Sequence, residues 1–89
     1  MLNELRALVI ESDPAALARI AGLLDHKGFR IAARPSPDDS LDYVARTRPD
    51  VVLLGIDYWN QGWDSRILAA SPATVVFPVL EATESRSVA

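Results

Sequence analysis

The sequence predicts an α/β domain in which a parallel sheet of about four strands carries helices on both faces. Short, continuous apolar runs alternate along the chain with longer segments of helical periodicity. Such runs are typical of parallel strands, because both faces of a parallel sheet are buried. Proline, glycine and short polar residues separate the segments at the positions where helices begin and end. The 89 residues allow one small domain, which buries roughly 60–65% of its unfolded surface.

The composition excludes several classes of function. The sequence contains no cysteine, which excludes disulfides, thiolate metal sites and cysteine nucleophiles. The net charge is −3 and no basic run occurs, so we expect no direct contact with nucleic acid. The N-terminus lacks the layout of a signal peptide, and no apolar run approaches the roughly 18 residues of a membrane span. We therefore expect a cytoplasmic domain without a membrane partner.

The chain begins with a strand and a helix. Residues 5–10 form a nearly continuous apolar run, which predicts a buried strand. Asp13 and Pro14 then suit the N-cap and the first position of a helix, and Gly28 suits its left-handed end. The residues expected on the buried face of this helix are Ala16, Leu17, Ile20, Leu23 and Leu24.

Gly22 lies inside this first helix and costs it up to about 1 kcal/mol of stability relative to alanine, and we attribute the glycine to close packing against the sheet.

An edge strand and a second helix follow. Residues 29–33 alternate between apolar and other residues, which predicts a half-exposed strand at a sheet edge. Ser36 and Pro37 are expected to begin the second helix, and Pro49 to follow its end. Its expected buried residues are Leu41, Val44 and Ala45.

The second half of the chain centres on a buried strand at residues 50–54, followed by Gly55. We expect an aromatic loop over residues 57–63, a weak helix over 64–70 and a final strand over 74–80. Short connections and right-handed crossovers then predict a parallel, flavodoxin-like sheet in a three-layer arrangement with helices on both faces. Flavodoxin-like sheets begin with strand order 2-1-3-4, which we expect here. The domain is expected to span residues 1–80 and to end in a tail at residues 81–89.

Two stretches resemble the receiver domains of response regulators. Residues 8–14 (LVIESDP) resemble the end of the first strand of that family and the turn after it. Residues 48–54 (RPDVVLL) resemble the approach to its third strand. The spacing between these stretches also fits, and the resemblance covers about residues 5–80, in the order of the first four strands of the family.

The resemblance assigns roles to individual positions. Receivers are phosphorylated on an aspartate after the third strand, hold Mg²⁺ with two acids after the first, and contact the phosphoryl group through a hydroxyl and a lysine. Glu11 matches the first acid, Ser12 replaces the second, and Gly55 stands at the phosphoacceptor position. The hydroxyl position falls near residues 79–80, and the lysine has no counterpart. The resemblance therefore implies a receiver-like module without aspartate phosphorylation.

Two acids are weighed as substitutes. If the strand continued past Gly55, Asp57 would point to the same side, roughly 6–7 Å further along, so we consider it as a displaced phosphoacceptor. Glu11 and Asp57 together form a candidate weak Mg²⁺ site. The alternative, which we favour, is a pair of solvated carboxylates. No other cofactor is expected.

Aromatic and edge residues are the candidate interaction sites. The aromatic residues after the third strand serve either as buried caps over the sheet or as exposed interface anchors. A receiver has one further strand and two further helices, so residues 74–80 would form an unpaired apolar edge. We expect a protein partner or self-association through this edge. The candidate interaction residues are Tyr58, Trp59, Trp63, Val75, Val76 and Phe77.

The sequence therefore favours a non-enzymatic regulatory module of a two-component or phosphorelay type of signal transduction system, acting by protein–protein interaction. One alternative is the truncated input domain of a larger transcription regulator or antiterminator. A second alternative is a small enzyme or phosphate-binding domain, because the same fold carries many functions.

Overall fold

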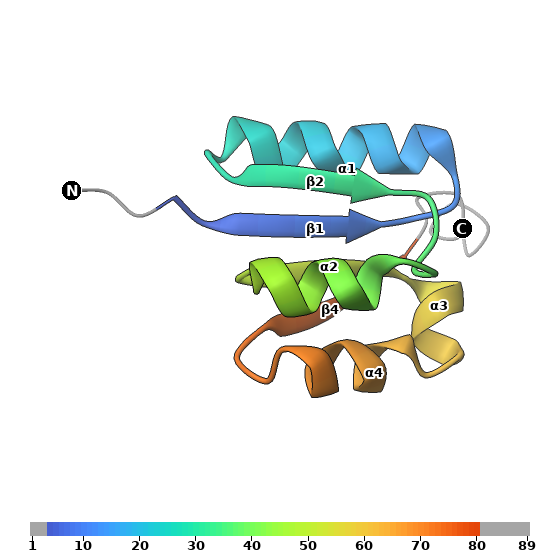
Figure 1. Cartoon of the computed structure of the whole chain (residues 1–89). Coiled ribbons are helices and arrows are strands. Elements are labelled where there is room, and N and C mark those ends of the chain that lie inside the picture. The colour runs from blue at the N-terminus through green and yellow to red at the C-terminus, as the bar shows by residue number, and fades with distance from the viewer. Residues whose placement is uncertain (1–3, 81–89) are drawn as a thin grey trace.

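A computed structural model of the chain describes residues 4–80, which form a four-stranded parallel sheet flanked by helices (Figure 1). The strands are β1 (Arg6–Ile10), β2 (Arg30–Arg34), β3 (Val51–Gly55) and β4 (Val75–Val79), in the order β2-β1-β3-β4. The helices are α1 (Pro14–His26), α2 (Ser40–Thr47), α3 (Ile56–Asn60) and α4 (Trp63–Ala70). This confirms the predicted fold class and strand order, with β2 at one edge. The predicted tail, residues 81–89, lies outside the described residues.

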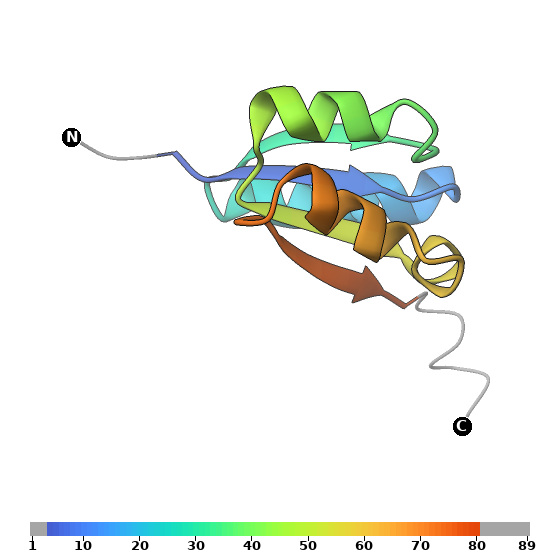
Figure 2. The same ribbon diagram turned by 60° about the horizontal axis from the view of Figure 1, so that its bottom comes forward.

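The main core lies between the sheet and the layer formed by α2 and α4. These two helices pack against each other on one face, while α1 lies on the opposite face against β1 and β2 (Figure 2). Leu8 pairs with Val52 across β1 and β3, and side chains of directly paired residues share a face. The fully buried residues of this core are Leu8, Ile10, Val44, Val52, Leu54 and Ile67.

The α1 face of the sheet is covered unevenly. Ala7 and Val9 on β1 are buried beneath α1, at 3% and 0% exposure. On β3 and β4 the residues of the same face are only half-buried or exposed: Val51, Leu53, Val75 and Phe77. The two halves of this face therefore differ, because the helix covers the strands at the β2 side.

Helix α1 begins where the sequence predicts, but two details differ. Asp13 occupies the N-cap position without a side-chain hydrogen bond to the helix. The predictions that Leu23 is buried and that Gly22 packs closely against the sheet are wrong. Leu23 is 66% exposed, and a Cβ added at Gly22 would meet no atom within 4 Å. The reason is the narrow contact of α1, which rests on two strands and leaves the rest of its circumference open.

Helix α2 begins three residues later than the Ser36 N-cap predicts, with Asp39 at its N-cap. The Ser36 hydroxyl instead accepts a hydrogen bond of 3.2 Å from the Asp38 amide, which makes a turn. The Ser40 hydroxyl donates to the Ser36 carbonyl at 3.3 Å and closes that turn. Ala45, predicted to be buried, is exposed.

The aromatic segment after β3 is helical, so the prediction of a loop is wrong. Helix α3 follows β3 directly, and Asp57 lies in its first turn, where free amide groups favour an acid. Gly62 separates α3 from α4 with a φ of 88°, a left-handed conformation that glycine adopts without steric cost. The strand does not continue past Gly55, so the geometry that would have aligned Asp57 with Gly55 does not arise.

Candidate functional site

The carboxyl edge of β1 holds a buried glutamate. Glu11 follows β1 directly and is 6% exposed. Its amide donates to the Arg34 carbonyl at 3.0 Å, which ties it to the end of β2. Its Oε2 atom accepts a hydrogen bond of 3.0 Å from the Asp13 amide, one of the free donors at the start of α1. The carboxylate is thus held in place at a helix N-terminus, an environment that favours its negative charge.

The Glu11 carboxylate also occupies the space above Gly55. A Cβ atom at residue 55 would lie 2.8 Å from Oε1 of Glu11 and 3.4 Å from the Ile10 carbonyl oxygen. Gly55 has φ −50° and ψ 143°, a conformation open to any residue. A side chain at residue 55 therefore requires the end of the Glu11 side chain to move, and the backbone conformation does not itself demand glycine. In this conformation the Glu11 carboxylate occupies the position that the resemblance assigns to a phosphoacceptor.

The other candidate site residues lie away from the contact between Glu11 and Gly55. Ser12 and Asp57 are exposed, Ser12 in the turn before α1 and Asp57 on α3. Among residues 4–80, no three histidine, cysteine or acidic side chains are close enough to hold a metal ion. Oε2 of Glu11 accepts a hydrogen bond from the Asp13 amide, so Oε1 is the less engaged oxygen of this carboxylate. A weaker two-carboxylate site at Glu11 and Asp57 stays a prediction.

The three aromatic residues partly cap the core. Tyr58, Trp59 and Trp63 are half-buried and pack against the central cluster. The Tyr58 hydroxyl donates to the Pro35 carbonyl at 3.0 Å, which links α3 to the segment after β2. The Arg66 guanidinium lies 4.7 Å from the centre of the Trp63 ring. These contacts give the aromatic residues a structural role, and their use as interface anchors stays a prediction.

The residues of β4 divide between the two faces of the sheet. Val75 and Phe77 lie on the α1 face and are 49% and 48% exposed. Val76 lies on the opposite face and packs against the core. Among residues 4–80, β4 has no neighbouring strand on its outer side. Two of the three predicted strand residues are therefore available at the surface.

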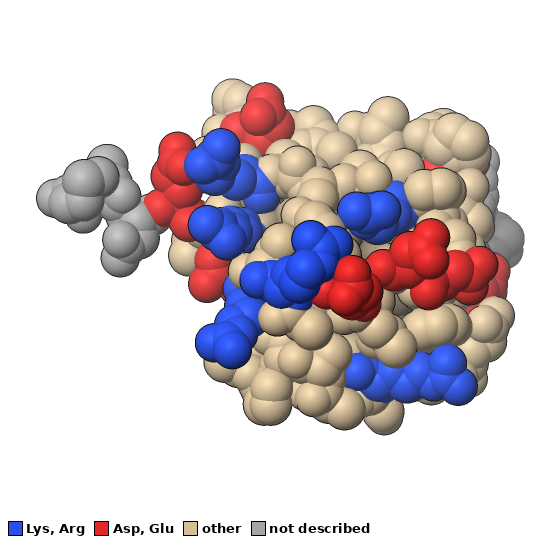
Figure 3. Space-filling model, in the orientation of Figure 1, with Lys and Arg blue, Asp and Glu red and all other residues tan. Residues whose placement is uncertain are grey.

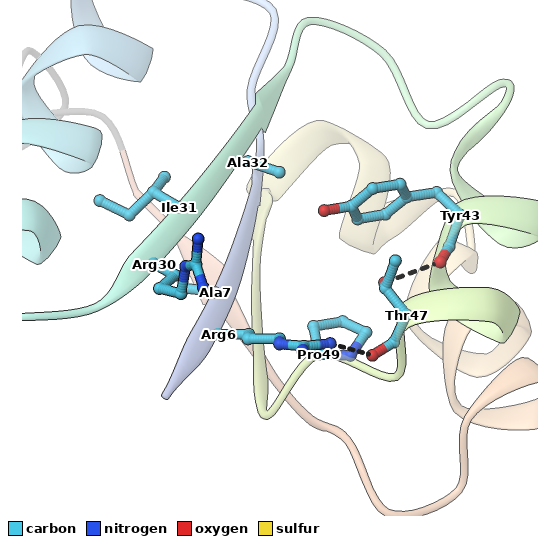
Figure 4. Close-up of a pocket in the computed structure, with 8 residues that line it drawn as sticks. All are labelled: Arg6, Ala7, Arg30, Ile31, Ala32, Tyr43, Thr47 and Pro49. Carbon is cyan, nitrogen blue, oxygen red and sulfur yellow. Dashed lines mark hydrogen bonds between the residues drawn. The ribbon is translucent and has the colours of Figure 1, made fainter. Parts of the chain in front are cut away.

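Sequence reasoning missed a pocket near the amino ends of the strands, between β2, β1 and α2 (Figure 4). Its volume is about 310 Å³, and its lining residues are Arg6, Ala7, Arg30, Ile31, Ala32, Tyr43, Thr47 and Pro49. Figure 3 shows Lys and Arg side chains gathered on the face formed by β1, β2 and α2. The available signal was the alternation of β2, which places Arg30, Ala32 and Arg34 on one face.

Comparison with known proteins leaves the family open. A scan against protein-family models and a search of curated proteins found no match to the chain. No helix within residues 4–80 is long and apolar enough to cross a lipid bilayer.

Proposed function

We propose that this chain is a receiver-like regulatory module that acts by protein–protein interaction and not by aspartate phosphorylation. The observation that carries the proposal is the open apolar surface at β4. We name this surface the β4 patch and define it as Val51, Leu53, Val75 and Phe77, which share one face of β3 and β4.

The position of Glu11 beside Gly55 supports the proposal that residue 55 takes part in no phosphoryl transfer. An acceptor side chain at residue 55 would need the space that the Glu11 carboxylate fills. A second negative group there would also stand beside that buried carboxylate, and close like charges repel each other unless a cation compensates them. The edge therefore disfavours a phosphoaspartate on steric and electrostatic grounds.

The β4 patch supports a docking role. Val75 and Phe77 each expose about half of their surface on a strand whose outer edge is open within the described residues. Open strand edges pair readily with further strands, and large contiguous apolar areas mark interaction sites. We infer that the β4 patch binds a second copy of the chain, since the same strand offers both a free edge and apolar side chains for a symmetric contact.

Analytical ultracentrifugation over a range of concentrations tests this proposal. We expect the wild-type chain to associate and the Phe77→Ser variant to associate more weakly, because the substitution removes the largest side chain of the β4 patch. Leu68→Ser is the matched control, since Leu68 is 38% exposed on α4, outside the patch. A wild-type chain that sediments as a monomer at every concentration would refute self-association.

Intact-mass measurement tests the proposal that the chain is not phosphorylated on an aspartate. Incubation with acetyl phosphate and Mg²⁺ is expected to add no phosphoryl group to the wild-type chain. A phosphorylated species that disappears in Asp57→Asn would show that Asp57 is an acceptor and would overturn the proposal.

A further inference from the structure

The pocket between β2, β1 and α2 brings two arginines together. Arg6 and Arg30 are directly paired across β1 and β2, so their side chains leave the same face of the sheet side by side. Like charges in directly paired positions repel each other and destabilise a sheet. None of the eight residues that line the pocket is acidic. The nearest acids lie just outside the lining: the Asp50 carboxylate accepts a hydrogen bond of 2.8 Å from the Arg6 amide, and Glu4 pairs with Arg30. The pocket itself thus carries two positive charges on a chain whose net charge is −3.

Arg6 and Arg30 each contact one acceptor of the protein, and most of their N–H donors stay available. Arg30 Nη1 lies 3.1 Å from Glu4 Oε1, but these side chains are 67% and 62% exposed, so the ion pair is weak. Arg6 Nη1 donates to the Thr47 carbonyl at 3.2 Å, a contact that orients the guanidinium across the pocket (Figure 4). Because each guanidinium carries five N–H donors, both arginines retain donors for a ligand.

Tyr43 supplies a further donor on the opposite wall. Its hydroxyl points from α2 toward the strands (Figure 4), and it makes no hydrogen bond within residues 4–80. The Arg34 guanidinium lies 4.7 Å from the centre of the Tyr43 ring, which fixes the ring by a cation–π contact. The Thr47 hydroxyl donates to the Tyr43 carbonyl at 2.8 Å and holds the same turn of α2. The Arg34 contact thus positions the ring that carries this hydroxyl.

We propose that this pocket binds a small organic molecule through a phosphate monoester group. Guanidinium groups present planar forks that match phosphate oxygens, and a hydroxyl donor can bond to a further oxygen. A volume of about 310 Å³ lies at the lower end of the range for ligand pockets, which fits a small molecule. Ala32, Pro49 and the Tyr43 ring give the pocket apolar walls for the organic part of the ligand, while Ala7 and Ile31 point to the α1 face of the sheet.

This site is separate from the carboxyl edge of the sheet and from the β4 patch. It lies near the amino ends of β1 and β2, whereas Glu11 and Gly55 lie at the carboxyl ends of β1 and β3. Its ligand is held without covalent change. The two proposals can therefore fail independently.

The test is a titration of the full chain with phenyl phosphate, followed by ¹H–¹⁵N NMR at ionic strength held constant with NaCl. We expect saturable shifts centred on residues 6–7, 30–32 and 43. Arg30→Gln is expected to weaken binding roughly tenfold, the loss that one charge-assisted hydrogen bond produces. Tyr43→Phe keeps the ring and is expected to weaken binding several-fold, because it removes the donor alone.

Arg66→Gln is the matched control, since Arg66 also lies over an aromatic ring but outside the pocket. It is expected to bind phenyl phosphate as the wild-type chain does, and each variant is compared only after its free spectrum shows the native pattern. Non-saturable shifts, shifts reproduced by NaCl, or equal weakening by Arg66→Gln would overturn the proposal. Equal affinity for benzoate would replace the phosphate specificity with general anion binding and would likewise overturn it.

Discussion

The contact between Glu11 and Gly55 makes a quantitative prediction about the Gly55→Ala variant. A methyl group at residue 55 would stand 2.8 Å from Oε1 of Glu11, so the carboxylate must retreat by roughly half an ångström to reach an ordinary contact. That movement weakens the 3.0 Å hydrogen bond from the Asp13 amide, at a cost of about 1–2 kcal/mol. Alanine gains about 0.5–1 kcal/mol over glycine in a strand. We expect a net loss of about 0.5–1 kcal/mol.

The same substitution is expected to act in the opposite direction when the glutamate is removed. In a Glu11→Ala background no side chain blocks residue 55, so Gly55→Ala keeps only its gain of about 0.5–1 kcal/mol. The double-mutant cycle should therefore show a coupling free energy of about 1–2 kcal/mol.

Urea unfolding of the four proteins measures this coupling. Trp59 and Trp63 both pack against the core, so their fluorescence reports loss of packing. A coupling below about 0.3 kcal/mol would mean that the two sites act independently, and it would refute the steric argument.

Three further variants test other contacts by the same unfolding assay. Gly22→Ala should stabilise the chain by about 0.5–1 kcal/mol, because Gly22 lies in a helix with open space around it; a loss of stability would contradict that geometry. Thr74→Val should lower the free energy of unfolding by about 1–3 kcal/mol, because the buried Thr74 hydroxyl donates to the Pro49 carbonyl at 2.7 Å and shares a hydrogen bond of 2.8 Å with the Ser71 hydroxyl. An unchanged urea midpoint would show that these two hydrogen bonds do not contribute to stability. Tyr58→Phe should cost about 0.5–1.5 kcal/mol through its lost hydrogen bond, and a neutral effect would remove the link between α3 and the segment after β2.

The strands were predictable from the sequence because burial on both faces leaves a direct pattern. The runs at residues 5–10 and 50–54 correspond to β1 and β3, and the strand order is the one expected of a flavodoxin-like sheet. The helix boundaries were harder. Ser36 has the chemistry of an N-cap, yet its hydroxyl bonds to the Asp38 amide, a local turn that competes with a helix start.

Side-chain environment was predictable only where a single element determines it. Leu23 fits the apolar stripe of α1, but its exposure depends on how much sheet lies beneath the helix. The sequence shows a glycine at residue 55, but it does not show what surrounds that glycine. The Glu11 carboxylate approaches residue 55 from the end of a different strand. The pairing of Arg6 with Arg30 was hidden for the same reason, since it depends on the register of β1 and β2.

The parallel sheet also makes folding depend on contacts between segments that are distant in the sequence. Every strand pair joins segments separated by a helix or more: Arg6 pairs with Arg30, Ala7 with Val51 and Val51 with Val75. No hairpin exists within this sheet to form early from neighbouring residues. Non-local pairing slows folding because a loop must close before the contact forms. As the chain is synthesised, β1 emerges first and must wait for β2 and then β3, so its apolar residues stay unpaired longest.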